Sequence, residues 1–227
     1  MKVLLAWSSG KDSAWALHVL RRQRDVEVSG LLTTVNQTHG RVAMHAVRRE
    51  LLERQAHAAG LPLTVVPIPY PCPNEVYEAA MAQVLASARE AGAEGVAFGD
   101  LFLEDVRRYR EERMAGTGLA CLFPLWGRPT AELAQEMIDC GLRAWLTCID
   151  PRRLPSHFAG RAFDAALLAE LPPEVDPCGE YGEFHSFAWD GPMFRERVTT
   201  QPGEVVERDG FVFADLLPAA ASEGAGA

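Results

Sequence analysis

The chain has 227 residues, of which 48% are hydrophobic, and its formal net charge is −9. This length can bury the core of one large domain, or of a domain with a smaller appendage. The acidic balance disfavours broad binding to nucleic acids or anionic membranes, because such surfaces need clustered basic residues. The arginines between Arg107 and Arg113 are interleaved with acids and are typical of a solvated helix face.

The cysteines and the hydropathy favour a cytoplasmic setting. The five cysteines include no CxxC pair, which fits a reducing compartment and offers no zinc-ligand spacing. No apolar run reaches the length of about 18 residues that a membrane span needs. The apolar run before Ser8 is too short for a signal sequence. We therefore expect a cytoplasmic protein without a membrane partner.

Apolar runs alternate with helical patterns through the first two thirds of the chain. Strands are expected at 3–7, 28–34, 63–67, 95–98, 120–124 and 144–149. Helices are expected at 12–23, 45–59, 74–91, 103–115 and 130–140, and glycines stand where three of them should end, at Gly60, Gly92 and Gly141. This alternation predicts an α/β fold with a doubly wound, mostly parallel, Rossmann-like sheet that carries helices on both faces.

The character of the sequence changes after Pro151. A helix is expected near 161–170, an extended stretch at 184–189, and a hairpin of 205–207 and 211–213 that turns at Asp209-Gly210. We therefore predict three parts: an N-terminal domain over 1–120, a smaller α+β C-terminal subdomain over 121–217, and a disordered tail over 218–227.

A loop of small residues, Ser8-Ser-Gly-Lys-Asp-Ser13, joins the first expected strand to the first expected helix. Its Lys11 is one of only two lysines in the chain. Such a loop aims backbone N–H groups and the positive end of a helix at an anion. It is not a Walker A sequence, because Leu5 stands where that pattern has its first glycine. A plain N-cap with an exposed lysine is the alternative, but the position between strand and helix favours a nucleotide-binding loop.

A second cluster of polar residues lies near the C-terminus, between Cys178 and Phe194. Glu180, Glu183 and His185 fall within six residues, beside glycines that permit tight turns. Such groups can bind Mg²⁺, orient a substrate amine or act as a general base. The alternative is an exposed turn with solvated acids and with His185 packed on a neighbouring aromatic ring, and the residues alone leave both open.

Both clusters resemble motifs of one family. The loop resembles the PP-loop, Ser-Gly-Gly-Lys-Asp-Ser, of the ATP pyrophosphatases in the adenine nucleotide α-hydrolase-like superfamily, with Ser9 in place of a glycine. Cys-Gly-Glu-Tyr-Gly-Glu-Phe-His-Ser-Phe, followed by Asp-Gly-Pro-Met-Phe, resembles the C-terminal signature of the diphthine–ammonia ligase-like (diphthamide synthase) family. Gly99-Asp100, Pro124-Leu-Trp126 and Gly160-Arg161 follow in family-like order. The resemblance runs from residue 2 to about 217 and implies a PP-loop ATP-binding domain over 1–120, a substrate-side subdomain over 121–217 and an active site between them.

The resemblance also implies a reaction and its participants. ATP is cleaved between its α- and β-phosphates, a substrate carboxylate is adenylated, and ammonia converts it to an amide with release of AMP. The acceptor is either a small molecule or a modified residue on a protein, and Mg²⁺ accompanies ATP. The implied ATP-binding residues are Ser8, Ser9, Gly10, Lys11, Asp12, Ser13 and Asp100. Asp12 and Asp100 are the candidates for Mg²⁺, Glu180, Glu183 and His185 for the substrate, and Lys11, Asp12, Glu183 and His185 for catalysis.

One departure from the family pattern concerns the acceptor. Members that use diphthine usually read Glu-Gly-Gly-Glu-Tyr-Glu, whereas this chain has Tyr181 for a glycine and His185 for the third carboxylate. Three carboxylates suit the trimethylammonium group of diphthine, and a mostly neutral imidazole suits it less. The acceptor is therefore open between diphthine and another acid. A tRNA-modifying PP-loop enzyme and a non-catalytic ATP- or AMP-binding regulatory module are the competing hypotheses.

Overall fold

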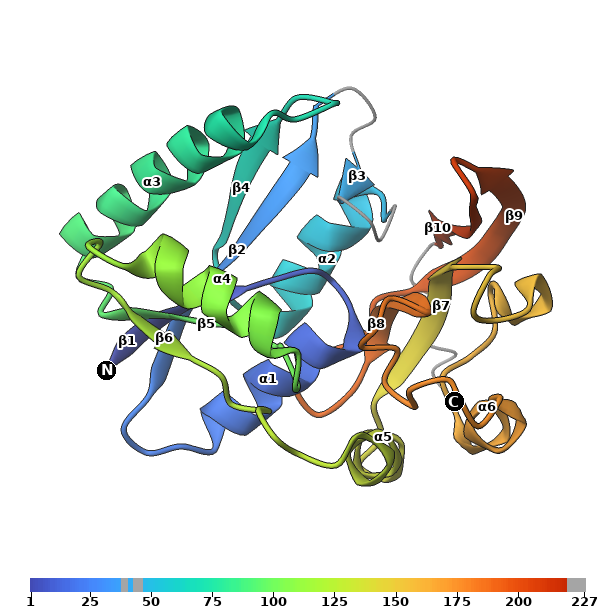
Figure 1. Ribbon diagram of the computed structural model, residues 1–227. Helices are drawn as coiled ribbons and strands as arrows, with labels where there is room; N and C mark the ends of the chain where they lie inside the picture. Colours follow the sequence, from blue (N-terminus) through green and yellow to red (C-terminus); the bar gives the residue numbers. More distant parts are fainter. Residues whose placement is uncertain (38–40, 43–46, 220–227) are drawn as a thin grey trace.

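A parallel sheet forms the N-terminal part of the computed structural model, which describes residues 1–37, 41–42 and 47–219 (Figure 1). Its parallel strands run in the order β4-β2-β1-β5-β6, and a short β3 pairs antiparallel with β2. The strands are β1 (Lys2–Ala6), β2 (Glu27–Asn36), β3 (Arg41–Val42), β4 (Leu63–Ile68), β5 (Gly95–Ala97) and β6 (Ala120–Leu122). The predicted α/β class with a mostly parallel sheet is confirmed.

Helices cover both faces of this sheet, because successive side chains of each strand point to opposite sides. Leu5 and Leu31 pack in one core cluster with α1 (Lys11–Arg21) and α2 (Arg49–Ala59). Leu32 and Val96 pack in a second cluster with α3 (Asn74–Glu90) and α4 (Glu104–Met114). The doubly wound arrangement follows from these two clusters.

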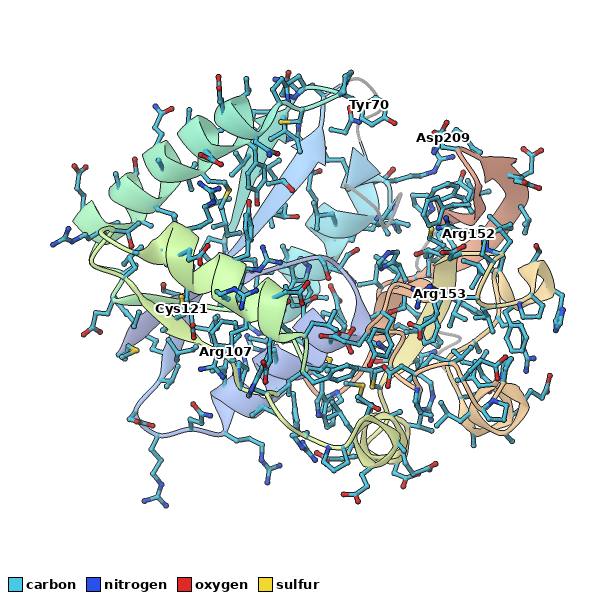
Figure 2. All side chains as sticks on the ribbon, viewed as in Figure 1. Tyr70, Arg107, Cys121, Arg152, Arg153 and Asp209 are labelled. Atoms are coloured by element: carbon cyan, nitrogen blue, oxygen red, sulfur yellow. The ribbon has the colours of Figure 1, made fainter. Side chains whose placement is uncertain are left out.

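An antiparallel sheet forms the C-terminal part, with strand order β8-β7-β10-β9. Its strands are β7 (Arg143–Ile149), β8 (Phe184–Asp190), β9 (Thr200–Arg208) and β10 (Phe211–Pro218), and its helices are α5 (Thr130–Asp139), the 3₁₀ turn η1 (Ser156–Phe158) and α6 (Ala165–Glu170). The expected hairpin turns at Asp209 and Gly210, whose φ angles of 54° and 77° match a type I′ turn. Figure 2 shows Asp209 at the tip of this hairpin.

Four expected elements differ in detail from the structure. The strand expected at 144–149 belongs to the antiparallel sheet, since it pairs with β8 and β10. The helix expected at 161–170 begins only at Ala165: the side chain of Asp164 caps it by accepting from the Leu167 N–H, and the preceding residues run beside β7. The helix expected at 45–59 begins at Arg49, and residues 45–46 lie outside the described residues. Of the expected tail, Pro218 pairs with Thr200, and residues 220–227 lie outside the described residues.

The division into domains at residue 120 stays a prediction. β6, the last strand of the parallel sheet, ends at Leu122, and α5 begins at Thr130. No helix among the described residues is long and apolar enough to cross a membrane.

The two sheets meet where α1 lies beside β8 (Figure 1). Buried Gln55 of α2 joins three segments there: its amide nitrogen donates to the carbonyl oxygens of Ser9 (2.9 Å) and Ala188 (2.6 Å). Its amide oxygen accepts from the indole N–H of Trp7 at 3.0 Å. The core cluster beneath continues from Leu5 into Leu146 and Phe187 without a break. The PP-loop is therefore fastened to the C-terminal sheet.

Replacing Gln55 by leucine tests this junction. The new side chain is similar in size but leaves the Trp7 N–H and the two carbonyl groups without their amide partner in a dry interior. We expect a loss of about 1–3 kcal/mol in the free energy of unfolding, measured as a lower urea midpoint at unchanged slope.

The matched control is Gln135→Leu on the exposed surface of α5, where the glutamine donates a hydrogen bond to Asp139 four residues on. It should change the unfolding free energy by less than about 0.5 kcal/mol. Equal midpoints for the two variants would show that the Gln55 bonds contribute no net stability.

Candidate active site

A cavity of about 420 Å³ opens at the carboxyl ends of β1, β2 and β5, where ligands bind in doubly wound sheets. Its wall comes from both sheets: the PP-loop and α3–α4 on one side, and residues 179–186 on the other. Of the site residues expected from the sequence, those that line it are Ser8, Lys11, Asp12, Ser13, Asp100, Glu180 and His185. Ser9, Gly10 and Glu183 are not among its lining residues.

The PP-loop folds as a tight turn that leads directly into α1. The Gly10 N–H donates to Ser8 Oγ at 3.3 Å, and Ser13 Oγ donates back to the Gly10 carbonyl at 3.0 Å. Ser9 has a φ of 70°, a left-handed conformation that glycine adopts more easily than serine. Its buried hydroxyl has no hydrogen-bond partner among the described residues. This conformation explains why glycine is usual at the position.

The first turn of α1 supplies donors to the cavity. Gly10 is the N-cap and no side chain caps the helix. The N–H of Lys11 donates to Ser186 Oγ of β8 at 3.1 Å, and the Ala14 N–H is the first to bond within the helix, to the Gly10 carbonyl oxygen at 3.1 Å. Gly99 at the end of β5 lies against this turn, because a Cβ there would come within 3.1 Å of Asp12 and Ser13 backbone atoms. Such a turn can bind phosphate oxygens.

The Lys11 ammonium is buried and held by protein acceptors. Its Nζ lies 2.8 Å and 2.9 Å from the two carboxylate oxygens of Asp12 and donates to the Cys178 carbonyl oxygen. The rings of Phe163 and Phe184 lie 5.5 Å and 5.4 Å from it. Burial is the largest single influence and opposes the charge, but Asp12, Cys178 and Glu180 together outweigh it and raise the pKa of Lys11. The side chain stays protonated and links α1 to the C-terminal part.

The C-terminal wall is a turn that Asp176 organises. Its Oδ2 accepts from the N–H groups of Cys178 (3.1 Å) and Glu180 (3.0 Å). Behind this turn lies Glu183, only 1% exposed, whose Oε1 accepts from the Asp176 N–H at 3.1 Å. Its Oε2 has no partner among the described residues. Glu183 thus supports the turn from inside, and Gly179 allows it, since a Cβ there would lie 2.9 Å from the Phe184 carbonyl oxygen.

Glu180 is the carboxylate that this turn presents to the cavity. Its Oε1 accepts from the Leu101 N–H at 2.8 Å, across from the end of β5. Burial raises the pKa of Glu180 to about 7, although the Leu101 N–H opposes the shift. The side chain can therefore gain or lose a proton near neutral pH, as a general base requires. His185 of β8 lines the same cavity.

Asp100 follows β5 and contacts a residue that the sequence analysis missed. Its Oδ2 lies 3.4 Å from Nε of Arg110 on α4. The arginine-rich stretch was expected to be a solvated helix face, but Arg110 lines the cavity and its guanidinium stacks 5.1 Å from the centre of the Phe98 ring. The spacing of Arg107, Arg110 and Met114 was the available signal, because it places them on one helix face.

Arg107, on the same face, has a different environment. Its guanidinium lies 4.8 Å from the ring centres of both Phe123 and Trp126, and it is not among the cavity-lining residues. The lining residues missed from the sequence also include Thr33, Thr34 and Tyr77, which belong to β2 and α3 and carry no motif.

The cavity has carboxylates enough for a metal that binds together with phosphates. The described residues contain no group of three or more His, Cys, Asp or Glu residues placed to hold a metal alone. Mg²⁺ commonly uses only one or two carboxylates and takes its remaining ligands from substrate phosphates and water. Asp12 and Asp100 line the same cavity and fit that requirement. The five cysteines are free, and burial raises the pKa of Cys148 to about 12, so that thiol is no thiolate nucleophile at neutral pH.

Comparison with known proteins agrees with this arrangement of two parts. Residues 1–119 match the model of the diphthamide synthase N-terminal domain, and residues 129–213 match that of the diphthamide synthase C-terminal domain. The diphthine–ammonia ligase of Bos taurus is 26% identical over 238 aligned positions, which cover 95% of this chain and 89% of the relative. The Homo sapiens enzyme of the same name is 31% identical over 129 positions (54% and 48%), and that of Danio rerio 34% identical over 133 positions (56% and 52%). The chain therefore belongs to the diphthamide synthase family, whose members are ATP-dependent ligases.

Proposed function

We propose that this protein is an AMP-forming ligase that adenylates a carboxylate with ATP and converts it to an amide with ammonia. The observation that carries the proposal is the shared cavity: the PP-loop at the start of the chain and the turn bearing Glu180 near its end line one space. Nucleotide-binding and proton-accepting groups can thus act on the same substrate. The free cysteines support a reducing, cytoplasmic setting for the reaction.

The PP-loop residues would hold the triphosphate. Ser8 and Ser13 line the cavity beside the first turn of α1, and the helix end adds partial positive charge. Asp12 and Asp100 would hold Mg²⁺, which would neutralise charge on the phosphates. These groups are positioned before the substrate arrives, so they stabilise developing charge without reorganising.

The acceptor chemistry then has two steps. A carboxylate oxygen attacks the α-phosphorus of ATP and pyrophosphate leaves, which gives an acyl-adenylate. The nitrogen of ammonia attacks the acyl carbon, AMP leaves, and the nitrogen loses a proton. Glu180, which lines the cavity, would accept that proton, since its pKa of about 7 lets it act as a base at neutral pH.

The acceptor is diphthine or another acid, on a small molecule or on a protein. Of the three groups implied for it, Glu180 and His185 face the cavity, whereas Glu183 lies behind the turn. The turn and β8 therefore offer one carboxylate and one imidazole to an acceptor. This set is less suited to a trimethylammonium group than three carboxylates would be, and it favours an acceptor with less positive charge.

Replacing Lys11 by alanine tests the assignment of the PP-loop. The purified chain is incubated with Mg-ATP, ammonium and a fractionated extract that contains candidate acids, and AMP and ADP are separated by mass spectrometry. We expect extract-dependent AMP and pyrophosphate from the wild type, and a decrease of about 100-fold or more in Lys11→Ala, because the buried charge that joins Asp12 to the Cys178 carbonyl is lost and the two walls of the cavity are displaced.

The chain offers a matched control in Lys2→Ala, since Lys2 is its other lysine and is exposed at the start of β1. Thermal unfolding of each variant separates lost chemistry from lost folding. Formation of ADP in place of AMP would contradict the proposal. ATP binding without turnover across all acids would instead favour a regulatory module.

The pKa of Glu180 predicts a pH dependence. The base form of Glu180 is needed, so kcat/KM at a fixed concentration of free ammonia should rise as pH increases through about 7. In Glu180→Gln this rise should vanish and the rate should be low at every pH. A rise that persists unchanged in the variant would assign the titration to another group.

Glu183 is expected to act through the turn rather than on the substrate. In Glu183→Ala the Asp176 N–H loses its acceptor, and the turn that carries Glu180 loosens. We expect AMP formation to fall on the order of 100-fold, the cost of a displaced catalytic group, while the Kd of Mg-ATP changes much less. Glu183→Gln keeps an acceptor oxygen and should recover part of the activity.

The control for this effect is Glu174→Ala, which removes an exposed acid two residues before Asp176. It should leave AMP formation and the Kd of Mg-ATP unchanged. Equal losses of ATP affinity and of AMP formation in Glu183→Ala would show that Glu183 serves the nucleotide site instead.

A further inference from the structure

Arg110 is a cavity-lining cation to which neither the PP-loop motif nor the C-terminal motif gives a role. It extends from α4 and meets Asp100 at the end of β5. Among the described residues that line the cavity, Lys11 and Arg110 are the lysine and arginine side chains, and Asp12, Asp100 and Glu180 are the carboxylates. A triphosphate entering this space therefore meets more acidic than basic side chains, and each basic group matters for its binding.

Lys11 has little capacity left for a phosphate. An ammonium carries three N–H donors, and here three acceptor oxygens lie around it: two of Asp12 and the carbonyl of Cys178. A phosphate oxygen that approaches Lys11 has to displace one of these partners. The ammonium alone does not provide an open cationic site.

Arg110, in contrast, keeps donors to spare. A guanidinium has five N–H donors in a planar fork. Its Nε contact with Asp100 is long, at 3.4 Å, and the Tyr77 phenol also lies within its reach. Two such partners do not use all five donors. The guanidinium carbon lies 5.1 Å from the centre of the Phe98 ring, a cation–π contact that helps to hold the fork in place before a ligand binds.

The position of Arg110 relates it to the phosphates rather than to the C-terminal wall. Gly99 packs against the backbone of Asp12 and Ser13, and the next residue, Asp100, contacts Arg110. The guanidinium thus lies beside the residue that follows Gly99, and it lines the same cavity as the PP-loop. A fork that binds oxygens in pairs suits a phosphate group.

We propose that Arg110 binds the β- and γ-phosphate oxygens of ATP and the same oxygens in the departing pyrophosphate, an inference that rests on the proposed function. Arg110 then compensates for the saturated Lys11 and determines how tightly the pyrophosphate end is held. The carboxylate of an acceptor is the other anion that could meet this residue, and the experiment below distinguishes it.

The test is calorimetric binding of Mg-ATP, AMP and inorganic pyrophosphate with Mg²⁺ to the full chain and to Arg110→Met, which keeps an apolar stem over Phe98. We expect Mg-ATP and pyrophosphate to bind about 10- to 100-fold more weakly, as for the loss of one or two charged hydrogen bonds, and AMP to bind as before. Arg110→Lys, which keeps the charge without the fork, should lie between the wild type and Arg110→Met.

Arg107→Met is the matched control, because it removes a guanidinium from the same helix outside the cavity and should leave all three affinities unchanged. If the wild type binds none of the three ligands, the proposed function itself fails. If the wild type binds them and Arg110→Met binds Mg-ATP equally well, the inference alone fails and an acceptor anion becomes the ligand of Arg110. An equal loss for AMP would also overturn it, since AMP lacks the pyrophosphate end.

Discussion

The carbonyl oxygen of Ser9 is the acceptor on which the geometry of the site depends. It receives the N–H of Ala188 from β8 at 3.0 Å and the side-chain amide of Gln55 from α2 at 2.9 Å. Both bonds turn this carbonyl away from the cavity and hold Ser9 at its positive φ. The Lys11 N–H in the first turn of α1 also bonds to β8, since it donates to Ser186 Oγ at 3.1 Å. Because the Ala188 N–H belongs to β8, the phosphate-binding turn and the C-terminal wall are fixed relative to each other.

Much of the N-terminal fold could be predicted because its signals are local. Buried runs of residues alternate with amphipathic ones. The three glycines that were expected to end helices have a left-handed backbone in the structure, with φ of 65° at Gly60, 90° at Gly92 and 90° at Gly141. The pairing of β7 could not be predicted in this way. Its apolar run looks like one more strand of a parallel sheet, and only β8 and β10, later in the chain, make it the centre of an antiparallel one.

The residues of the site also divide into those with a local sequence signal and those whose position depends on distant contacts. The PP-loop residues and Glu180 could be chosen because each follows a short motif with a known backbone requirement. The orientation of Glu183 could not, since it depends on a bond to the Asp176 N–H that turns the side chain away from the cavity. Arg110 was missed because its charge suggested solvent, whereas the rotation of α4 is set by the packing of Met114 beneath it. Composition indicates what a helix face contains, and packing decides where that face points.

Charge ties the two halves of the cavity together. Lys11 contacts Asp12 on its own helix and the Cys178 carbonyl, two residues before Glu180 in the opposite wall. A phosphate oxygen that drew the ammonium toward itself would weaken its hold on Cys178, and the Cys178 and Glu180 N–H groups share the Asp176 carboxylate. A displacement at the phosphate site would thus reach the base through a chain of direct hydrogen bonds. Binding of the nucleotide and placement of Glu180 are therefore parts of one electrostatic network, in which Lys11 is the link.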